Sequence, residues 1–159
     1  MRIKGITDED FVNYKVPSMF ISTNTCTLKC DIENDSHDCQ NSSLLKQPSI
    51  DMDLDAIISR YLSNPITKAI VFGGLEPFDQ FADVYDLVFK LRNDKHNDDP
   101  VVIYTGYNKN EIDGKIRMLE PLGNIIVKFG RYKPENRQHF DPILGVNLAS
   151  DNQYAEQIS

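Results

Sequence analysis

The 159-residue sequence has no long apolar run, and no apolar segment follows Met1. A transmembrane helix needs about 20 consecutive apolar residues, so none is predicted. A secretory leader needs an apolar stretch near the N-terminus, and without one we expect a soluble protein of the cytoplasm. The sequence also lacks low-complexity segments and internal repeats, and its length is that of one ordinary domain, 1–159.

Cysteine is scarce, with three residues in the whole chain, and an odd number cannot pair completely. A chain of this length buries enough apolar surface to fold without covalent cross-links. We therefore expect free thiols in a reducing compartment, and no structural disulfides.

Basic residues are outnumbered by acidic ones, 17 against 24, which gives a formal net charge of -7. Proteins that bind nucleic acids rely on Lys and Arg to neutralise the phosphates. The charge therefore argues against a nucleic-acid partner, and the membrane is excluded as a partner by the missing apolar runs. Small molecules and other proteins are the expected partners.

All three cysteines lie in one 14-residue stretch, at Cys26, Cys30 and Cys39, directly after the apolar run 19–21. This spacing predicts a loop that leaves the end of a strand and curls around something small. Thiolates are soft ligands for zinc and for iron-sulfur clusters, so the loop, 24–41, is predicted to hold a metal centre. The alternative is a set of unconnected thiols with no shared ligand.

Strands and amphipathic helices alternate along the rest of the chain. The apolar runs 16–23, 69–72, 101–104 and 125–127 predict buried strands. Apolar residues with helical spacing predict helices at 54–62, 81–91 and 112–119, the first capped by Asp51 or Asp53. This alternation is typical of right-handed βαβ units and a parallel sheet.

The two ends of the chain carry weaker signals. Residues 2–6 predict a short edge strand followed by an acidic turn at 7–10, and 144–148 predict a possible last strand. The C-terminal segment, 140–159, is expected to end as a polar tail.

Four loops follow predicted strands: the cysteine loop, 73–77, 105–107 and 130–132. In parallel sheets ligands bind at the carboxyl ends of the strands, so these loops should share one site. Gly73 and Gly74 would let a ligand approach the backbone closely, and Glu76 places a carboxylate beside that opening. The carboxylate could ligate a metal, act as a base or bind an ammonium group. The alternative is a plain turn, with Glu76 facing a helix dipole.

The chain resembles the activating proteins of anaerobic ribonucleotide reductase, a family of radical S-adenosylmethionine enzymes. Cys26-Thr27-Leu28-Lys29-Cys30 resembles the start of the family's CxxxCxxC motif. Gly73-Gly74-Leu75-Glu76-Pro77 resembles its Gly-Gly-Glu-Pro motif with a leucine inserted. Three further segments are similar to family elements, at 103–107, 130–132 and 150–153.

The resemblance implies that Cys26, Cys30 and Cys39 hold three irons of a 4Fe-4S cluster and that the fourth iron binds S-adenosylmethionine. In that family an external donor supplies an electron, a carbon-sulfur bond breaks, and the 5'-deoxyadenosyl radical takes hydrogen from a glycine of the reductase. Gly73, Gly74 and Glu76 would position the methionine end, with the glutamate matched to its ammonium group. Pro77 and Thr105 complete the cofactor-binding set that the resemblance implies.

The sequence departs from the family in the cysteine loop, where an acidic insertion, 31–38, moves the third cysteine to Cys39. A longer loop can still close on a cluster, because loop-closure entropy grows slowly with length. Two alternatives remain open. Cys26, Cys30, His37 and Cys39 form a Cys3His set that suits a structural zinc site, and a metal-free α/β protein would keep only the fold.

The predicted fold class is α/β, a partial (βα) barrel of the radical S-adenosylmethionine type with a mostly parallel sheet and flanking helices. A full barrel of this type has about six βα units, and this chain shows four clear strands. One side of the site would therefore stay open, and a radical facing water is poorly controlled. The missing wall is expected to come from the partner, the large subunit of anaerobic ribonucleotide reductase, which carries the glycyl radical.

Overall fold

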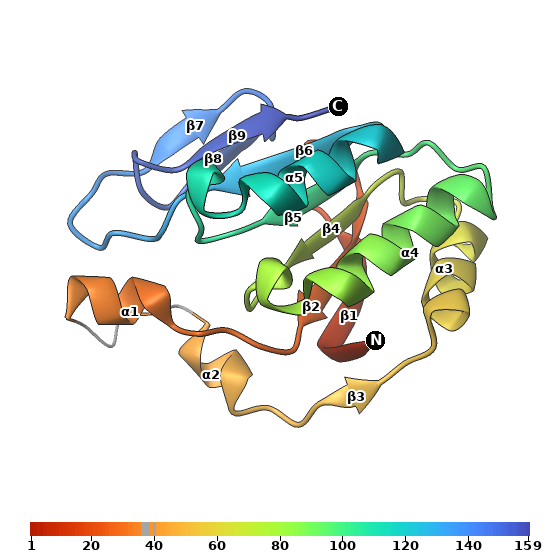
Figure 1. The fold of residues 1–159 in the computed structure, drawn as a ribbon, viewed down its shortest axis with the longest axis horizontal. Coiled ribbons are helices and arrows are strands. Elements are labelled where there is room, and N and C mark those ends of the chain that lie inside the picture. The colour runs from red at the N-terminus through yellow and green to blue at the C-terminus, as the bar shows by residue number, and fades with distance from the viewer. Residues whose placement is uncertain (36–38, 40) are drawn as a thin grey trace.

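In the computed structural model, residues 1–35, 39 and 41–159 are described, and the chain forms a seven-stranded sheet. Its strand order is β3-β1-β2-β4-β5-β6-β9 (Figure 1). The strands are β1 (Arg2–Asp10), β2 (Ser18–Thr23), β3 (Ile50–Asp51), β4 (Ile70–Gly73), β5 (Val101–Tyr104), β6 (Ile125–Phe129) and β9 (Tyr154–Gln157). β2, β4, β5 and β6 are parallel, which confirms the predicted α/β fold with a largely parallel sheet.

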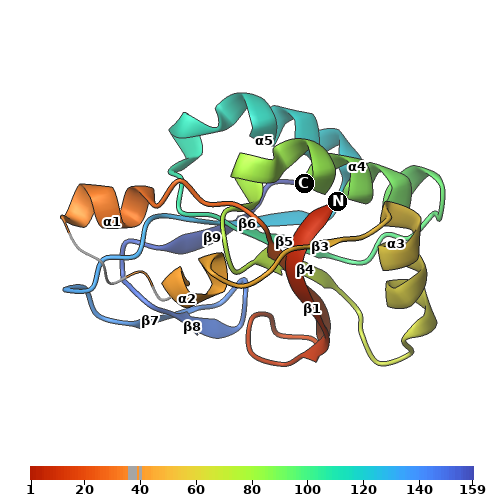
Figure 2. The ribbon, with the colours of Figure 1, turned by 90° about the horizontal axis from the view of Figure 1, so that it is seen from below.

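Three longer helices cover one face of this sheet, as Figure 2 shows. They are α3 (Leu54–Ser63), α4 (Phe81–Asn93) and α5 (Asp113–Leu119). The 3-10 turn η1 (Pro77–Gln80) precedes α4, and η2 (Lys109–Glu111) and η3 (Glu120–Leu122) flank α5. All three helices follow the predicted apolar stripes. Asp53 caps α3 by accepting a hydrogen bond from the Ala56 amide at 3.2 Å, as predicted for one of the two candidate caps.

The parallel strands are buried on both faces, which explains their nearly continuous apolar sequences. In β4, Ile70 and Phe72 pack in the helix-covered core, whereas Val71 packs in a second cluster on the opposite face. β6 alternates in the same way, with Val127 in the first core and Ile126 in the second. We call the face opposite the helices the inner face.

A two-stranded hairpin, β7 (His139–Asp141) and β8 (Val146–Leu148), covers part of the inner face (Figure 2). Asp141 orders it, since its carboxylate accepts backbone hydrogen bonds from Ile143, Leu144 and Ala155 at 2.8–3.0 Å. The short strand expected at 144–148 is confirmed as β8, but it pairs with β7 rather than with the main sheet and it is not the last strand. The segment expected as a polar tail instead supplies β9, which pairs antiparallel with β6.

Two other local predictions need correction. The acidic segment 7–10 is not a turn but the second half of β1, which pairs with β2 as far as Asp10. The cysteine segment is not an open loop throughout, because α1 (Lys29–Asn34) forms inside it and α2 (Ser42–Leu45) follows it. Apart from Asp10, which is buried, the described polar residues in both places are exposed or half-buried, and apolar periodicity gives no signal there.

The strand register brings the carboxyl ends of the parallel strands to one edge. Ser22 of β2 lies beside Gly73 of β4, and Tyr104 of β5 lies beside Lys128 of β6. The four loops that leave these strands therefore start side by side, as expected for a shared site. In the described part of the chain, no helix is long and apolar enough to cross a membrane.

Candidate functional site

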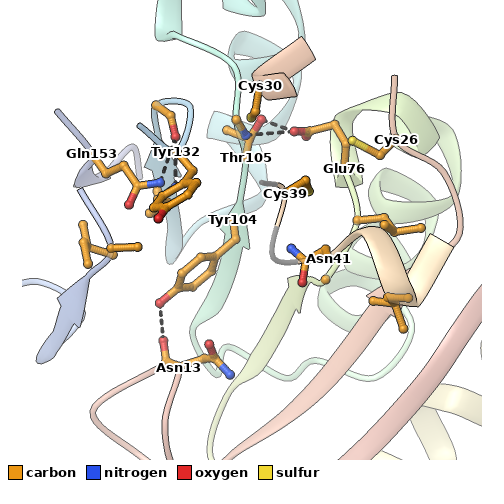
Figure 3. A pocket seen from close by; sticks show the side chains of 18 of the residues that line it. Asn13, Cys26, Cys30, Cys39, Asn41, Glu76, Tyr104, Thr105, Tyr132 and Gln153 are labelled. Carbon is orange, nitrogen blue, oxygen red and sulfur yellow. Dashed lines mark hydrogen bonds between the residues drawn. The ribbon is translucent and has the colours of Figure 1, made fainter. Parts of the chain in front are cut away.

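A cavity of about 510 Å³ opens at the carboxyl edge of the sheet. It is lined by residues from all four predicted loops and from the inner face (Figure 3). Cys26, Cys30, Cys39, Gly74, Glu76, Thr105 and Gly106 line it, together with Asn13, Tyr104, Lys128, Tyr132 and Gln153. Figure 3 shows the cysteines and Glu76 toward one end of the cavity and Asn13 at the other. A space of this size accepts a ligand of nucleoside dimensions.

The described thiols of the cysteine loop are half-buried and unpaired by disulfides. The pKa of the Cys26 thiol is raised to about 11, mainly by burial and in smaller part by the charges of Glu76 and Asp79, although the Leu28 amide donates to its Sγ at 3.3 Å. Burial also raises the pKa of the Cys30 thiol. Both groups are thus protonated at neutral pH until a metal displaces the proton, so metal binding releases protons here.

The helix that carries Cys30 is fixed to the sheet edge by an ionic cluster. Arg131, only 5% exposed, pairs with Glu33 of α1 at 2.9 Å and with Glu111 at 2.6 Å. Its fork binds both oxygens of Glu111, which lowers the pKa of that carboxyl to about 2. Lys29 lies 4.5 Å from the centre of the Tyr107 ring. These contacts hold Cys30 at the cavity wall and neutralise one of the acidic charges of the insertion.

Among the residues that the structure describes, no three His, Cys, Asp or Glu side chains gather closely enough to hold one metal ion. A tetrahedral zinc site needs its ligands about 2.0–2.3 Å from one ion. The described thiols instead stand around a cavity, an arrangement suited to a larger inorganic group. His37, the fourth ligand of the alternative Cys3His site, lies outside the described residues.

Glu76 joins three of the loops at the cavity, since its own amide donates to the Thr25 carbonyl of the cysteine loop at 2.8 Å. Its carboxylate accepts hydrogen bonds from the Phe78 amide at 3.0 Å, the Thr105 hydroxyl at 2.8 Å and the Gly106 amide at 2.8 Å. The residue is 7% exposed, and burial raises the pKa of its carboxyl to about 7 against the effect of these donors. A carboxylate has about four acceptor positions, so one stays available to a ligand in the cavity.

The loop 73–77, which we call the glycine loop, has a constrained backbone and lines the cavity without a side chain at Gly74. Gly74 lines the cavity with φ +78°, and a Cβ there would lie 2.9 Å from Leu44 Cδ2, so no larger residue fits. A Cβ on Gly106 would lie 3.3 Å from Cys30 Sγ. Gly73 and Pro77 do not line the cavity: Gly73 packs against the Phe20 ring, and Pro77 starts η1. Of the predicted cofactor-binding residues, Gly74, Glu76 and Thr105 therefore face the cavity directly.

A comparison with protein families matches residues 17–149 to the 4Fe-4S single cluster domain. The chain belongs to this family. The match covers the cysteine loop, the glycine loop and all four parallel strands. It supports a 4Fe-4S cluster-binding domain of the radical S-adenosylmethionine type. No curated protein and no solved structure matches the chain significantly.

The donor set of this 4Fe-4S single cluster domain fits such a cluster. Three thiols from one loop reach a common cavity. Lys29 is the basic residue between Cys26 and Cys30 in the sequence, and its ammonium group lies over the Tyr107 ring. Three thiolates leave one iron of a four-iron cluster without a protein ligand. Glu76 and Thr105 line the same cavity as these thiols.

The segments 130–132 and 150–153, which resemble family elements in the sequence, contact each other in the fold. The Asn152 amide donates to the Arg131 carbonyl at 2.8 Å, and the Gln153 amide donates to the Gly130 carbonyl at 3.3 Å. Gly130 has φ +99°, and a Cβ there would lie 3.0 Å from the Asn152 carbonyl oxygen. The segments 130–132 and 150–153 thus form one wall of the site through backbone contacts.

Two side chains that line the cavity from the inner face, Lys128 and Tyr104, were not predicted as site residues from the sequence. Lys128 lies in the apolar strand β6 and is 6% exposed, while the Tyr104 hydroxyl donates to the Asn13 carbonyl at 2.6 Å. A lysine at an inner-face position of an otherwise apolar strand was the available signal, since charged residues are rarely buried without a role.

Proposed function

We propose that this chain is a radical S-adenosylmethionine activase that generates a glycyl radical on anaerobic ribonucleotide reductase. The observation that carries the proposal is the cavity that joins Cys26, Cys30 and Cys39 to Gly74 and Glu76. In this proposal the three thiolates hold the 4Fe-4S cluster. S-adenosylmethionine occupies the adjoining volume, and an external donor supplies the electron.

When bound, the cluster would supply the one electron that cleaves the sulfonium of S-adenosylmethionine to methionine and a 5'-deoxyadenosyl radical, the species that would take a hydrogen atom from a glycine Cα to give 5'-deoxyadenosine and a glycyl radical. The chain's own residues bind and orient the ligand. Glu76 accepts a hydrogen bond from the ammonium group, and the absence of a side chain at Gly74 lets the ligand reach the backbone.

The open side of the site supports a protein substrate. The sheet is not closed, since β3 and β9 form its two edges, and the hairpin β7–β8 covers the inner face only in part. Phe11 and Val12, 64% and 71% exposed, directly precede the cavity-lining Asn13. Ile32, 73% exposed, lies on the same helix as Cys30. Exposed apolar side chains beside a site suit a partner that covers it.

The proposal is tested with reconstituted protein, S-adenosylmethionine, a reductant and the reductase large subunit, mixed without oxygen. We expect a glycyl radical signal in electron spin resonance and one 5'-deoxyadenosine per radical formed. A reductase whose radical-bearing glycine is replaced by alanine is the matched control and should give no signal. If 5'-deoxyadenosine forms at the same rate with and without every candidate reductase, and no glycyl signal appears, the activase assignment fails.

A further inference from the structure

Among the residues that the structure describes, Lys128 is a buried cation without a carboxylate partner. Its residue is 6% exposed, and its side chain lines the cavity from the inner face of β6. Its ammonium group donates one hydrogen bond, to the Gly130 carbonyl at 3.0 Å, and lies 5.9 Å from the centre of the Tyr104 ring. None of the ion pairs in the described residues involves Lys128. An ammonium has three donors, so two remain for a ligand.

The surroundings of Lys128 do not explain why a charge is kept there. Burial lowers the pKa of its ammonium to about 8, and the charge of Glu76, together with that of Cys30 once this thiol is deprotonated, opposes this effect. Removing a cation from water without pairing it destabilises a fold, so such groups are retained where a counter-ion binds. The Tyr104 hydroxyl donates its hydrogen bond to the Asn13 carbonyl, and Lys128 contacts only the face of the Tyr104 ring.

The charge balance of the cavity selects the class of anion. Of the described residues that line the cavity, Lys128 is the one cation, and Glu76 contributes a carboxylate to the same cavity. A phosphate carries up to two negative charges and would meet one ammonium, one carboxylate and a chain of net charge -7. A group with a single negative charge matches one ammonium better. A carboxylate has about four acceptor positions, enough for the two hydrogen bonds that Lys128 still offers.

We propose that Lys128 forms a carboxylate-binding subsite on the inner face, distinct from the ammonium position at Glu76. Because Lys128 and Glu76 line the same cavity, the two together suit the two charged ends of an amino acid. The carboxylate can belong to the methionine end of S-adenosylmethionine, a source that rests on the proposed function. It can also belong to the second substrate, a source that does not need S-adenosylmethionine at this position.

The test compares Lys128→Met, which keeps the length of the side chain and removes its charge, with Lys128→Arg, which keeps the charge. Lys109→Met is the matched control, because Lys109 pairs with Glu156 at 2.6 Å and does not line the cavity. Loss of a buried unpaired charge should leave the fold intact, and thermal unfolding of each variant checks this.

In the first arm, calorimetry on the reconstituted proteins measures binding of S-adenosylmethionine and of decarboxylated S-adenosylmethionine. We expect the wild type and Lys109→Met to bind the full ligand at least about tenfold more tightly than the decarboxylated one. Lys128→Met should bind both equally, through weaker binding of the full ligand alone, and Lys128→Arg should retain part of the preference. This result assigns the carboxylate to S-adenosylmethionine.

In the second arm, acetate is titrated onto each protein with and without saturating S-adenosylmethionine. If Lys128→Met leaves the affinity for S-adenosylmethionine unchanged but removes acetate binding seen in the wild type, the carboxylate belongs to the second substrate. If Lys128→Met changes the affinity for neither S-adenosylmethionine nor acetate, the proposed subsite is wrong. If the wild type binds no S-adenosylmethionine, the proposed function fails, and acetate binding to the protein alone still decides the subsite.

Discussion

Replacing any one of Cys26, Cys30 or Cys39 with serine should lower the iron content of reconstituted protein from about four per chain to below one. Each thiol lines the same cavity, so each is expected to hold one iron. A serine hydroxyl is a much poorer ligand for iron, because it is protonated at neutral pH and its oxygen is hard where the cluster prefers soft sulfur. Two remaining thiolates then leave two irons without protein ligands.

The measurement is anaerobic reconstitution followed by iron and sulfide analysis of the desalted protein. Ser43→Ala is the control, because Ser43 is exposed on α2 in the segment that follows Cys39. Retention of full iron and sulfide in the Cys39→Ser variant would show that the displaced third cysteine is not a ligand. The other two thiols would then need a different third partner.

Replacing Glu76 with glutamine should weaken S-adenosylmethionine binding by about tenfold to one hundredfold, since a hydrogen bond to a charged group contributes about 1.5–3 kcal/mol. The substitution removes the charge that the ammonium group would meet. It also places an amide donor where the Gly106 amide and the Thr105 hydroxyl now donate at 2.8 Å. One of these buried donors would lose its acceptor, so the loop 105–107 would shift as well.

Calorimetry on the reconstituted variant gives the affinity, and thermal unfolding separates the loss of the ligand contact from the loss of loop order. Glu120→Gln, an exposed substitution in η3, is the matched control and should change neither quantity. Unchanged S-adenosylmethionine binding in Glu76→Gln would remove Glu76 from the ligand site. Its role would then be limited to joining the three loops.

The sequence predicted the parallel strands and the longer helices because each buries a regular apolar pattern. β5 begins and ends as predicted, and α4 carries its buried residues on the predicted stripe. The periodicity is strong there because both faces of the sheet are covered. The same physics explains the gathering of the four loops, since parallel strands must end at one edge.

The elements that were missed lack such a pattern. β9 is a short edge strand, Tyr154–Gln157, in which only Ala155 is buried, so its polar sequence resembles a tail. The hairpin depends on Asp141, whose backbone contacts cannot be read from periodicity. α1 forms in an acidic segment where its ion pair with Arg131, about 100 residues later, stabilises it.

The residues of the candidate site also fall into those that sequence motifs indicate and those that they do not. The cysteines, Gly74, Glu76 and Thr105 could be proposed from motifs because they follow strands in a recognisable order. Lys128 could not, because its role depends on which face of β6 it occupies and on which charges lie across the cavity. Gly73 and Pro77 belong to the motif, yet they serve packing and the start of η1.

The central claim is that three thiols of this loop hold a 4Fe-4S cluster whose fourth iron is open to S-adenosylmethionine. The most direct test is the electron spin resonance spectrum of the reduced, reconstituted protein, recorded before and after S-adenosylmethionine is added, on samples of known iron, zinc and sulfide content. We predict about four irons with matching sulfide and a spectrum that changes on addition of the ligand. One zinc per chain without sulfide, or a cluster spectrum that the ligand leaves unchanged, would contradict the account.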